Sequence, residues 1–383
     1  MVDKVIVFTG SKKDFEVLLK ERIDASENTA TFLEVIQEYN RQIKNAGPRN
    51  NESTVPDNSL SRRIKVDNCV VRTDDYGSVL GHVVSNFAIT ISLNYDIKNL
   101  YIQNPPKRVL ESLQTFFNNI EYLQSEYNII TRDVLKDVYI SLNKNVMGQE
   151  ECKKQIISNI YKLTTQNTNK PVVIMLYGPS GVGKTESAKA ISESLGGRLL
   201  RIQFSMMQTV EAYNYVFGGE HSKSSFARDM IARETNVILI DEFDKVNSSF
   251  YNAFYELFDE GKYVDMNYEV KLNDAIFVCT CNFMSEKEIQ KALGPAMFSR
   301  IGSCIKYENI SVEFKKSIIN NTYNEIIEKL ECDERELIES SNILNWFLDN
   351  AARYDNIRIM KTKLENAIFE KLADTFIITD NTK

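Results

Sequence analysis

Eight residues near the middle of the chain have the types and spacing needed to hold a phosphate group. They read Gly178-Pro179-Ser180-Gly181-Val182-Gly183-Lys184-Thr185. This is the P-loop pattern, in which glycines let the backbone curl around an anion, a lysine reaches the outer phosphates and a hydroxyl holds Mg²⁺. The apolar run 172–177 before it predicts a buried strand, and the helical pattern 186–195 follows it. The N–H groups of the loop and of the helix N-terminus would then face the phosphate.

A second set of polar side chains follows two further predicted strands. Asp241 and Glu242 come directly after the apolar run 237–240, and open α/β sheets bind ligands at the carboxyl ends of their strands. Asp241 suits a Mg²⁺ shell, and Glu242 suits orientation of the water that attacks a γ-phosphate. Asn282 follows the predicted strand 275–280 and could sense that phosphate. Without the P-loop, the acidic pair would also fit a surface strand end, and the Asn an ordinary turn.

Composition excludes several other classes of protein. The 383 residues are 43% hydrophobic, with a formal net charge of −7, which fits a soluble globular chain and argues against a broad nucleic-acid-binding surface. The short basic cluster 62–65 is typical of a solvated loop. No apolar run is long enough to cross a bilayer, and the N-terminus lacks the layout of a signal peptide. We therefore expect a cytoplasmic protein with no membrane partner.

The order of predicted elements divides the chain into three parts. Residues 1–130 form an N-terminal α+β module of unknown function, with strands predicted at 5–8, 69–71 and 83–93. Helices are predicted there at 12–23, 31–45 and from Pro105 to about Tyr127. In residues 131–310 strands and helices alternate, which indicates an α/β fold whose mostly parallel sheet carries helices on both faces. Residues 311–383 are helical in pattern throughout and predict a small α domain.

With these motifs in hand, residues 146–309 resemble the nucleotide-binding domain of AAA+ ATPases, specifically the Clp-type branch of unfoldases and disaggregases. The matching blocks are 146–149, 178–186, 238–245, 257–265 and 295–301. The resemblance implies an AAA+ P-loop sheet followed by a small helical lid domain, and it implies ATP and Mg²⁺ at the site. It does not extend to the N-terminal module.

The resemblance also implies roles for particular residues. Asn282 takes the sensor-1 position, and Arg300 takes that of an arginine finger, which stabilises the transferring phosphoryl group of a neighbouring subunit. Outside this context, Arg300 would fit a surface salt bridge. Arg358 matches the sensor-2 position of the lid, although Asn356 and Ile357 differ from the Gly-Ala that usually precede it. The full binding set is Val146, Gly148, Pro179, Ser180, Gly181, Val182, Gly183, Lys184, Thr185, Glu186 and Arg358, with Thr185 and Asp241 as Mg²⁺ ligands and Glu242, Asn282 and Arg300 as catalytic residues.

One segment departs from the Clp pattern. Clp-type motors place an aromatic-hydrophobic-Gly pore loop before the acidic strand, whereas residues 215–225 are shorter than the corresponding segment and contain Phe217-Gly218-Gly219 instead. Tyr263 and Tyr268, in the following hairpin, could also face a central channel. The sequence therefore supports ATP hydrolysis more strongly than it supports threading of a polypeptide.

Together these features predict an oligomeric, hexamer-like ATPase that uses ATP to remodel or switch a protein partner, with the N-terminal module as recruiter or sensor. Two alternatives stay open. One is an ATPase subunit of a nucleic-acid-associated, defence or mobile-element complex. The other is an ATP-gated assembly scaffold with slow turnover.

Overall fold

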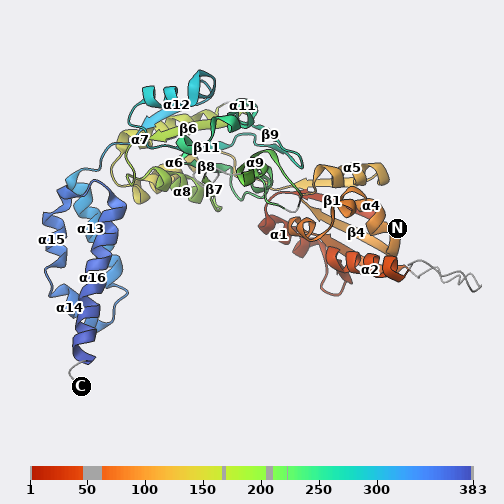
Figure 1. Cartoon of the computed structure of the whole chain (residues 1–383), viewed down its shortest axis with the longest axis horizontal. Coiled ribbons are helices and arrows are strands. Elements are labelled where there is room, and N and C mark those ends of the chain that lie inside the picture. The colour runs from red at the N-terminus through yellow and green to blue at the C-terminus, as the bar shows by residue number, and fades with distance from the viewer. Residues whose placement is uncertain (1, 46–62, 166–169, 204–209, 222, 381–383) are drawn as a thin grey trace, which may run out of the picture.

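The computed structural model describes residues 2–45, 63–165, 170–203, 210–221 and 223–380. Three bodies follow one another along its long axis (Figure 1): an N-terminal α/β module in red and orange, a central α/β domain in yellow to cyan, and a C-terminal group of helices in blue. No helix in these ranges combines the length and the apolar character that a membrane span requires.

The N-terminal module is built on a five-stranded sheet with the order β2-β3-β4-β1-β5. Every strand pairing in this sheet is parallel. The strands are β1 (Val2–Thr9), β2 (Thr29–Thr31), β3 (Ile64–Val71), β4 (Tyr95–Gln103) and β5 (Ile120–Gln124). The sequence predicted an α+β module, and the wholly parallel sheet makes this part of the chain α/β. Its carboxyl edge carries the loops after β1, β3, β4 and β5.

Helices cover both faces of this sheet. One face packs against α1 (Lys12–Arg22), and the other packs against α2 (Phe32–Asn45), α3 (Gly81–Ser85), α4 (Phe87–Asn94) and α5 (Lys107–Phe116). The strand predicted at 83–93 is wrong, because this stretch forms α3 and α4. Its buried residues Val83, Phe87 and Ile91 recur every four positions, which is helical spacing. The helix predicted from Pro105 to about Tyr127 is also too long, because α5 ends at Phe116 and β5 follows.

The central domain has a second parallel sheet, with the order β12-β6-β11-β8-β7. Its strands are β6 (Val172–Tyr177), β7 (Leu200–Gln203), β8 (Val237–Asp241), β11 (Ile276–Thr280) and β12 (Ser303–Lys306). Near-continuous apolar runs form β6, β8 and β11 because helices bury both faces of the sheet. One face packs against α6 (Arg132–Asn145), α7 (Glu150–Tyr161) and α8 (Lys184–Ser194). The predicted parallel sheet with flanking helices is confirmed.

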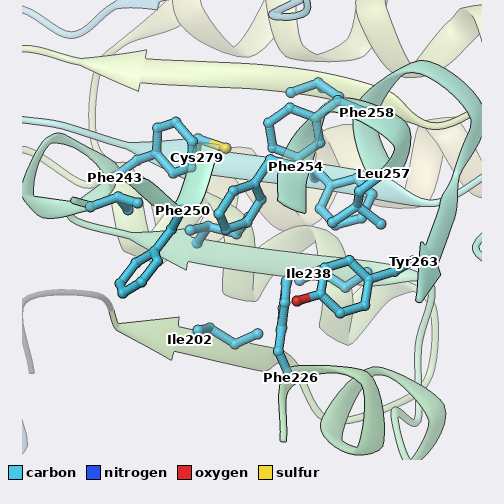
Figure 2. Packing of buried hydrophobic residues seen from close by; sticks show 14 of the residues in the cluster. Ile202, Phe226, Ile238, Phe243, Phe250, Phe254, Leu257, Phe258, Tyr263 and Cys279 are labelled. Carbon is cyan, nitrogen blue, oxygen red and sulfur yellow. The ribbon is translucent and has the colours of Figure 1, made fainter. Parts of the chain in front are cut away.

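An aromatic cluster fills the other face (Figure 2). It lies between the sheet and α10 (Phe226–Ile231), α11 (Tyr251–Glu260) and α12 (Glu286–Phe298). Phe254 of α11 is fully buried, with its ring centroid 5.5 Å from that of Phe243 and 5.8 Å from that of Phe226. Because Phe243 follows the acidic pair, this packing fixes the chain directly beyond Glu242.

A short hairpin, β9 (Lys262–Val264) and β10 (Glu269–Lys271), follows α11. The expectation that its tyrosines face a channel is wrong for this chain, because Tyr263 and Tyr268 are 2% and 4% exposed. Tyr263 packs edge-on against Phe226, and its hydroxyl donates to the carbonyl of Val216. Both rings therefore belong to the core, where Tyr263 ties the hairpin to α9 (Val210–Phe217).

The C-terminal part is helical, as predicted. It contains α13 (Val312–Ile327), α14 (Cys332–Glu339), α15 (Ile343–Asp349) and α16 (Ile357–Asp380), which enclose a separate apolar core. Met147 of the central domain packs against this core. The helical part is thereby held beside the loop that follows α6, close to the P-loop.

Candidate nucleotide-binding site

The glycine-rich loop joins β6 to α8 at the carboxyl end of the sheet. Gly181 and Gly183 have φ values of 80° and 106°, in the left-handed region that side chains other than glycine avoid. A Cβ atom on Gly181 would also lie 2.6 Å from Oδ1 of Asn356. The loop therefore needs glycine at Gly181 both for its backbone conformation and for the close approach of the C-terminal helices.

Lys184 begins α8 and turns back into the loop. Its Nζ donates to the carbonyl oxygens of Gly178 at 2.7 Å and Pro179 at 2.6 Å, and to Oδ1 of Asn282 at 3.1 Å. The residue is 7% exposed, and burial lowers the pKa of its ammonium group. Among the described residues Lys184 has no ion-pair partner, so an anion entering the loop would supply a missing counter-charge. The structure thus brings together the P-loop lysine and Asn282.

The two acidic residues lie at the carboxyl end of β8, beside the P-loop. Asp241 is 6% exposed; its Oδ1 accepts from the Thr280 hydroxyl, and its Oδ2 accepts from Arg201. Glu242 has φ 56°, and its backbone N–H donates to Oγ1 of Thr280 at 3.0 Å. The left-handed turn at Glu242 places the two carboxyl groups in different surroundings. That of Asp241 is buried at the end of β8, whereas that of Glu242 is half-buried; both residues line the cavity.

These groups line one cavity of about 530 Å³ between the central domain and the C-terminal helices. Its volume falls within the range of sites that hold small ligands. Most of the predicted site residues line it: Val146, Ser180, Gly181, Val182, Gly183, Lys184, Thr185, Glu186, Asp241, Glu242, Asn282 and Arg358. The structure thus collects residues from the loop after β6, the start of α8, the carboxyl ends of β8 and β11, and α16 around one space.

Three predicted residues lie outside this lining. Gly148 borders a neighbouring hollow, where a Cβ atom would come within 3.2 Å of the ring of Phe314. Pro179 contributes its carbonyl oxygen to Lys184 rather than a wall of the cavity. Arg300 follows α12, where its Nε donates to Asp259 at 2.8 Å and its guanidinium lies 4.3 Å from the centre of the Tyr255 ring. Arg300 therefore cannot act on a ligand of its own cavity from this position.

The C-terminal helices supply lining residues that sequence reasoning missed. Ile318, Asn321, Thr322 and Glu325 of α13 line the cavity, and their spacing of three and four residues defines one helical face. This helical periodicity in the sequence could have been used to predict which face of α13 lines the cavity. Asn356 caps α16 by accepting from the backbone N–H groups of Arg358 at 2.9 Å and Ile359 at 3.3 Å. Arg201 and Gln203 of β7 were also missed.

The cavity fits a nucleotide with a hard metal ion. Thr185 and Asp241 both line it and offer oxygen donors, the type that Mg²⁺ prefers. Among the described residues no group of three or more His, Cys, Asp or Glu side chains could hold a metal ion. Magnesium is often held by one or two carboxylates together with substrate phosphates. The residues present therefore fit an ion that arrives with a nucleotide.

A parallel sheet with this loop after β6 and an acidic pair at the end of β8, one strand further along the sheet beyond β11, is the arrangement of a P-loop nucleoside triphosphatase. Residues 169–331 match the family model for the AAA domain (Cdc48 subfamily). The chaperone protein ClpB of Malacoplasma penetrans (strain HF-2) is 25% identical over 279 residues, covering 65% of this chain and 39% of that protein. The ATP-binding subunit ClpL of an ATP-dependent Clp protease from Staphylococcus aureus (strain MRSA252) is 23% identical over 282 residues, covering 66% and 40%.

Residues 169–331 thus match an AAA domain, and the chain is similar to AAA+ ATPases of the Clp type. A Lon protease homolog of Acanthamoeba polyphaga mimivirus is also similar, with 26% identity over 279 residues that cover 68% of this chain and 26% of the homolog. The chain spans about two fifths or less of the length of these relatives.

Proposed function

We propose that this protein is an oligomeric ATPase that uses ATP hydrolysis to remodel or switch a protein partner, with residues 1–130 as recruiter or sensor. Residues 131–310 form the ATPase domain, and residues 311–383 form the lid. In this proposal Lys184 binds the outer phosphates, Glu242 orients the attacking water, and Thr185 and Asp241 hold Mg²⁺. The bound metal neutralises charge on the phosphates. Asn282 and Arg358 contact the terminal phosphates, and Arg300 serves a neighbouring subunit.

The observation that carries this proposal is the direct contact between the N-terminal module and the ATPase domain. Arg228 of α10 donates to Asp74 Oδ1 at 2.7 Å, and His221 Nε2 lies 3.0 Å from the carbonyl oxygen of Val79. Lys107 at the start of α5 donates from its backbone to Asn267 and from its Nζ to the carbonyl of Asp265, both at 2.7 Å. We call these contacts the seam. They join the carboxyl edge of the N-terminal sheet to the hairpin and α10.

The seam supports a sensor role because it meets the segment that replaces a pore loop. Met266, at the hairpin tip, donates its N–H to the carbonyl of Phe217 at 3.1 Å, so the hairpin, the end of α9 and the module form one connected surface. A partner that binds the module would thereby contact or displace this surface. The nucleic-acid alternative rests on the short basic cluster 62–65, in which Arg63 pairs with Asp96 at 3.3 Å and Arg62 lies outside the described residues.

Assembly is tested with the full chain carrying Glu242→Gln, which should hold ATP without turning it over. With ATP and Mg²⁺, light scattering and electron microscopy are expected to show a closed or helical oligomer with Arg300 at the next subunit's cavity. ADP should support less assembly. A monomer at micromolar concentrations with ATP bound would contradict the proposal of an oligomeric enzyme.

The sensor role is tested at the seam. The double variant Arg228→Ala, Lys107→Ala should keep basal ATP turnover, because neither side chain lines the nucleotide cavity. It should lose most of the change in turnover that the protein partner causes. The exposed variant Arg22→Ala, which removes a surface pair with Glu121, is the matched control. A partner response that survives seam disruption would rule out signalling through these contacts.

A further inference from the structure

The carboxylate of Asp241 is engaged by a second charged side chain from the neighbouring strand. Arg201 lies on β7, whose residues pair in register with β8, so that Arg201 stands opposite Leu239 and Gln203 opposite Asp241. Side chains two residues apart on a strand share a face. Arg201 can therefore reach Asp241, and its Nε and Nη2 both donate to Oδ2, at 3.0 Å and 2.5 Å.

The two partners differ in their access to solvent. The Asp241 side chain is 8% exposed, whereas that of Arg201 is 45% exposed and lines the nucleotide cavity. A buried carboxylate is unfavourable unless it is paired and hydrogen-bonded. Thr280 satisfies Oδ1, and Arg201 supplies the positive charge at Oδ2. The two contacts therefore hold the Asp241 carboxylate in place and give it a positively charged partner.

In the proposed site Asp241 would hold Mg²⁺ through this carboxylate, whose Oδ2 already accepts two hydrogen bonds from Arg201. A guanidinium and Mg²⁺ are both cations, so they repel each other when both stand against a single carboxylate oxygen. Arg201 is long, flexible and half in solvent, and can leave along the cavity wall, whereas Asp241 is fixed by the strand and by Thr280. Exchange of one cation for another at this carboxylate would thus require movement of Arg201 alone.

We propose that Arg201 is a positioning residue that acts as the resident counter-ion of Asp241 and gives way when Mg²⁺ enters with the nucleotide. This inference rests on the proposed assignment of Asp241 to Mg²⁺. Displacement of Arg201 would therefore make the binding free energy of metal-bound nucleotide less favourable. Binding of metal-free nucleotide would not require this displacement. Arg201 thereby sets how strongly the site prefers Mg·ATP to free ATP, a preference that a purely structural salt bridge would leave unchanged.

The experiment measures that preference directly in the full chain carrying Glu242→Gln, so that turnover does not interfere. The dissociation constant of a fluorescent ATP analogue is determined with excess Mg²⁺ and again with EDTA. Arg201→Ala is expected to raise the ratio of the EDTA value to the Mg²⁺ value by about tenfold, the equivalent of one charge-assisted hydrogen bond. Arg201→Lys, which keeps the charge and loses the two-pronged contact, should give an intermediate ratio and covers the case in which Arg201→Ala does not fold.

Controls separate this proposal from the assignment on which it rests. Arg198→Ala, at an exposed arginine just before β7, should leave the ratio unchanged. Asp241→Asn should lower the ratio, and Arg201→Ala should then have no further effect. An unchanged or lower ratio in Arg201→Ala overturns the proposal for Arg201. A parental ratio in Asp241→Asn removes the magnesium assignment of Asp241, and the proposal with it.

Discussion

Replacing Arg300 by alanine should lower steady-state ATP turnover by about 10³–10⁵-fold, the usual contribution of an arginine finger, and leave nucleotide affinity nearly unchanged. The reason is positional. Arg300 lies outside its own cavity, anchored by Asp259 and by the Tyr255 ring, so in the proposed oligomer it would act on a phosphoryl group in a neighbouring subunit. Turnover at fixed protein concentration and equilibrium binding of labelled ATP are the two measurements.

Mixing two inactive variants tests the action between subunits. Lys184→Ala subunits lack the ammonium that holds the phosphates but keep Arg300, whereas Arg300→Ala subunits bind ATP and lack the finger. Mixed oligomers should regain part of the lost turnover, because some Arg300→Ala cavities then face an intact arginine. A mixture as inactive as its parts, or an Arg300→Ala protein with normal turnover, would remove the proposed role.

Glu242→Gln is expected to reduce turnover by about 10²–10⁴-fold, the range for loss of a positioned general base, without weakening ATP binding. The amide has the same shape as the carboxylate but cannot take a proton from water. The backbone turn held by Thr280 is unaffected, because its contact is to the N–H of Glu242. Single-turnover hydrolysis and retention of bound ATP on a desalting column measure the two effects.

The control for this substitution is Glu260→Gln at the exposed end of α11. It makes the same chemical change far from the phosphate-binding loop and should leave turnover unaltered. If Glu242→Gln hydrolyses ATP at the normal rate, another group must orient the water. Normal turnover together with normal assembly would also remove the basis for using this variant as an ATP trap.

The parts of the site that short, continuous sequence motifs encode could be predicted. The P-loop, Asp241 and Glu242 each follow an apolar run at the end of a strand, so their placement at one sheet edge could be expected. Arg201 could not be found this way, because only the strand order brings β7 beside β8. Its partner lies 40 residues away along the chain, and no local pattern marks the pair.

The fold was predicted less evenly. The apolar run 83–93 could not be distinguished from a strand by hydrophobicity, although its four-residue recurrence favoured a helix. From the sequence, Tyr263 and Tyr268 could face a channel, lie on the surface or pack in the core. Their burial depends on the aromatic cluster around Phe226 and Phe254, which residues distant in sequence build together. Packing of this kind depends on which elements the fold brings together, and a local sequence pattern does not reveal it.

The seam also has a thermodynamic consequence. If a ligand of the N-terminal module binds one nucleotide state of the ATPase domain more tightly than another, nucleotide must change the affinity of that ligand by the same factor. Lys107 and Arg228 would then couple nucleotide binding in the ATPase domain to ligand binding by the module, and the reverse. The affinity of the module for its partner would then rise and fall during each ATPase cycle. The module would bind and release the partner in step with ATP hydrolysis, as well as sense it.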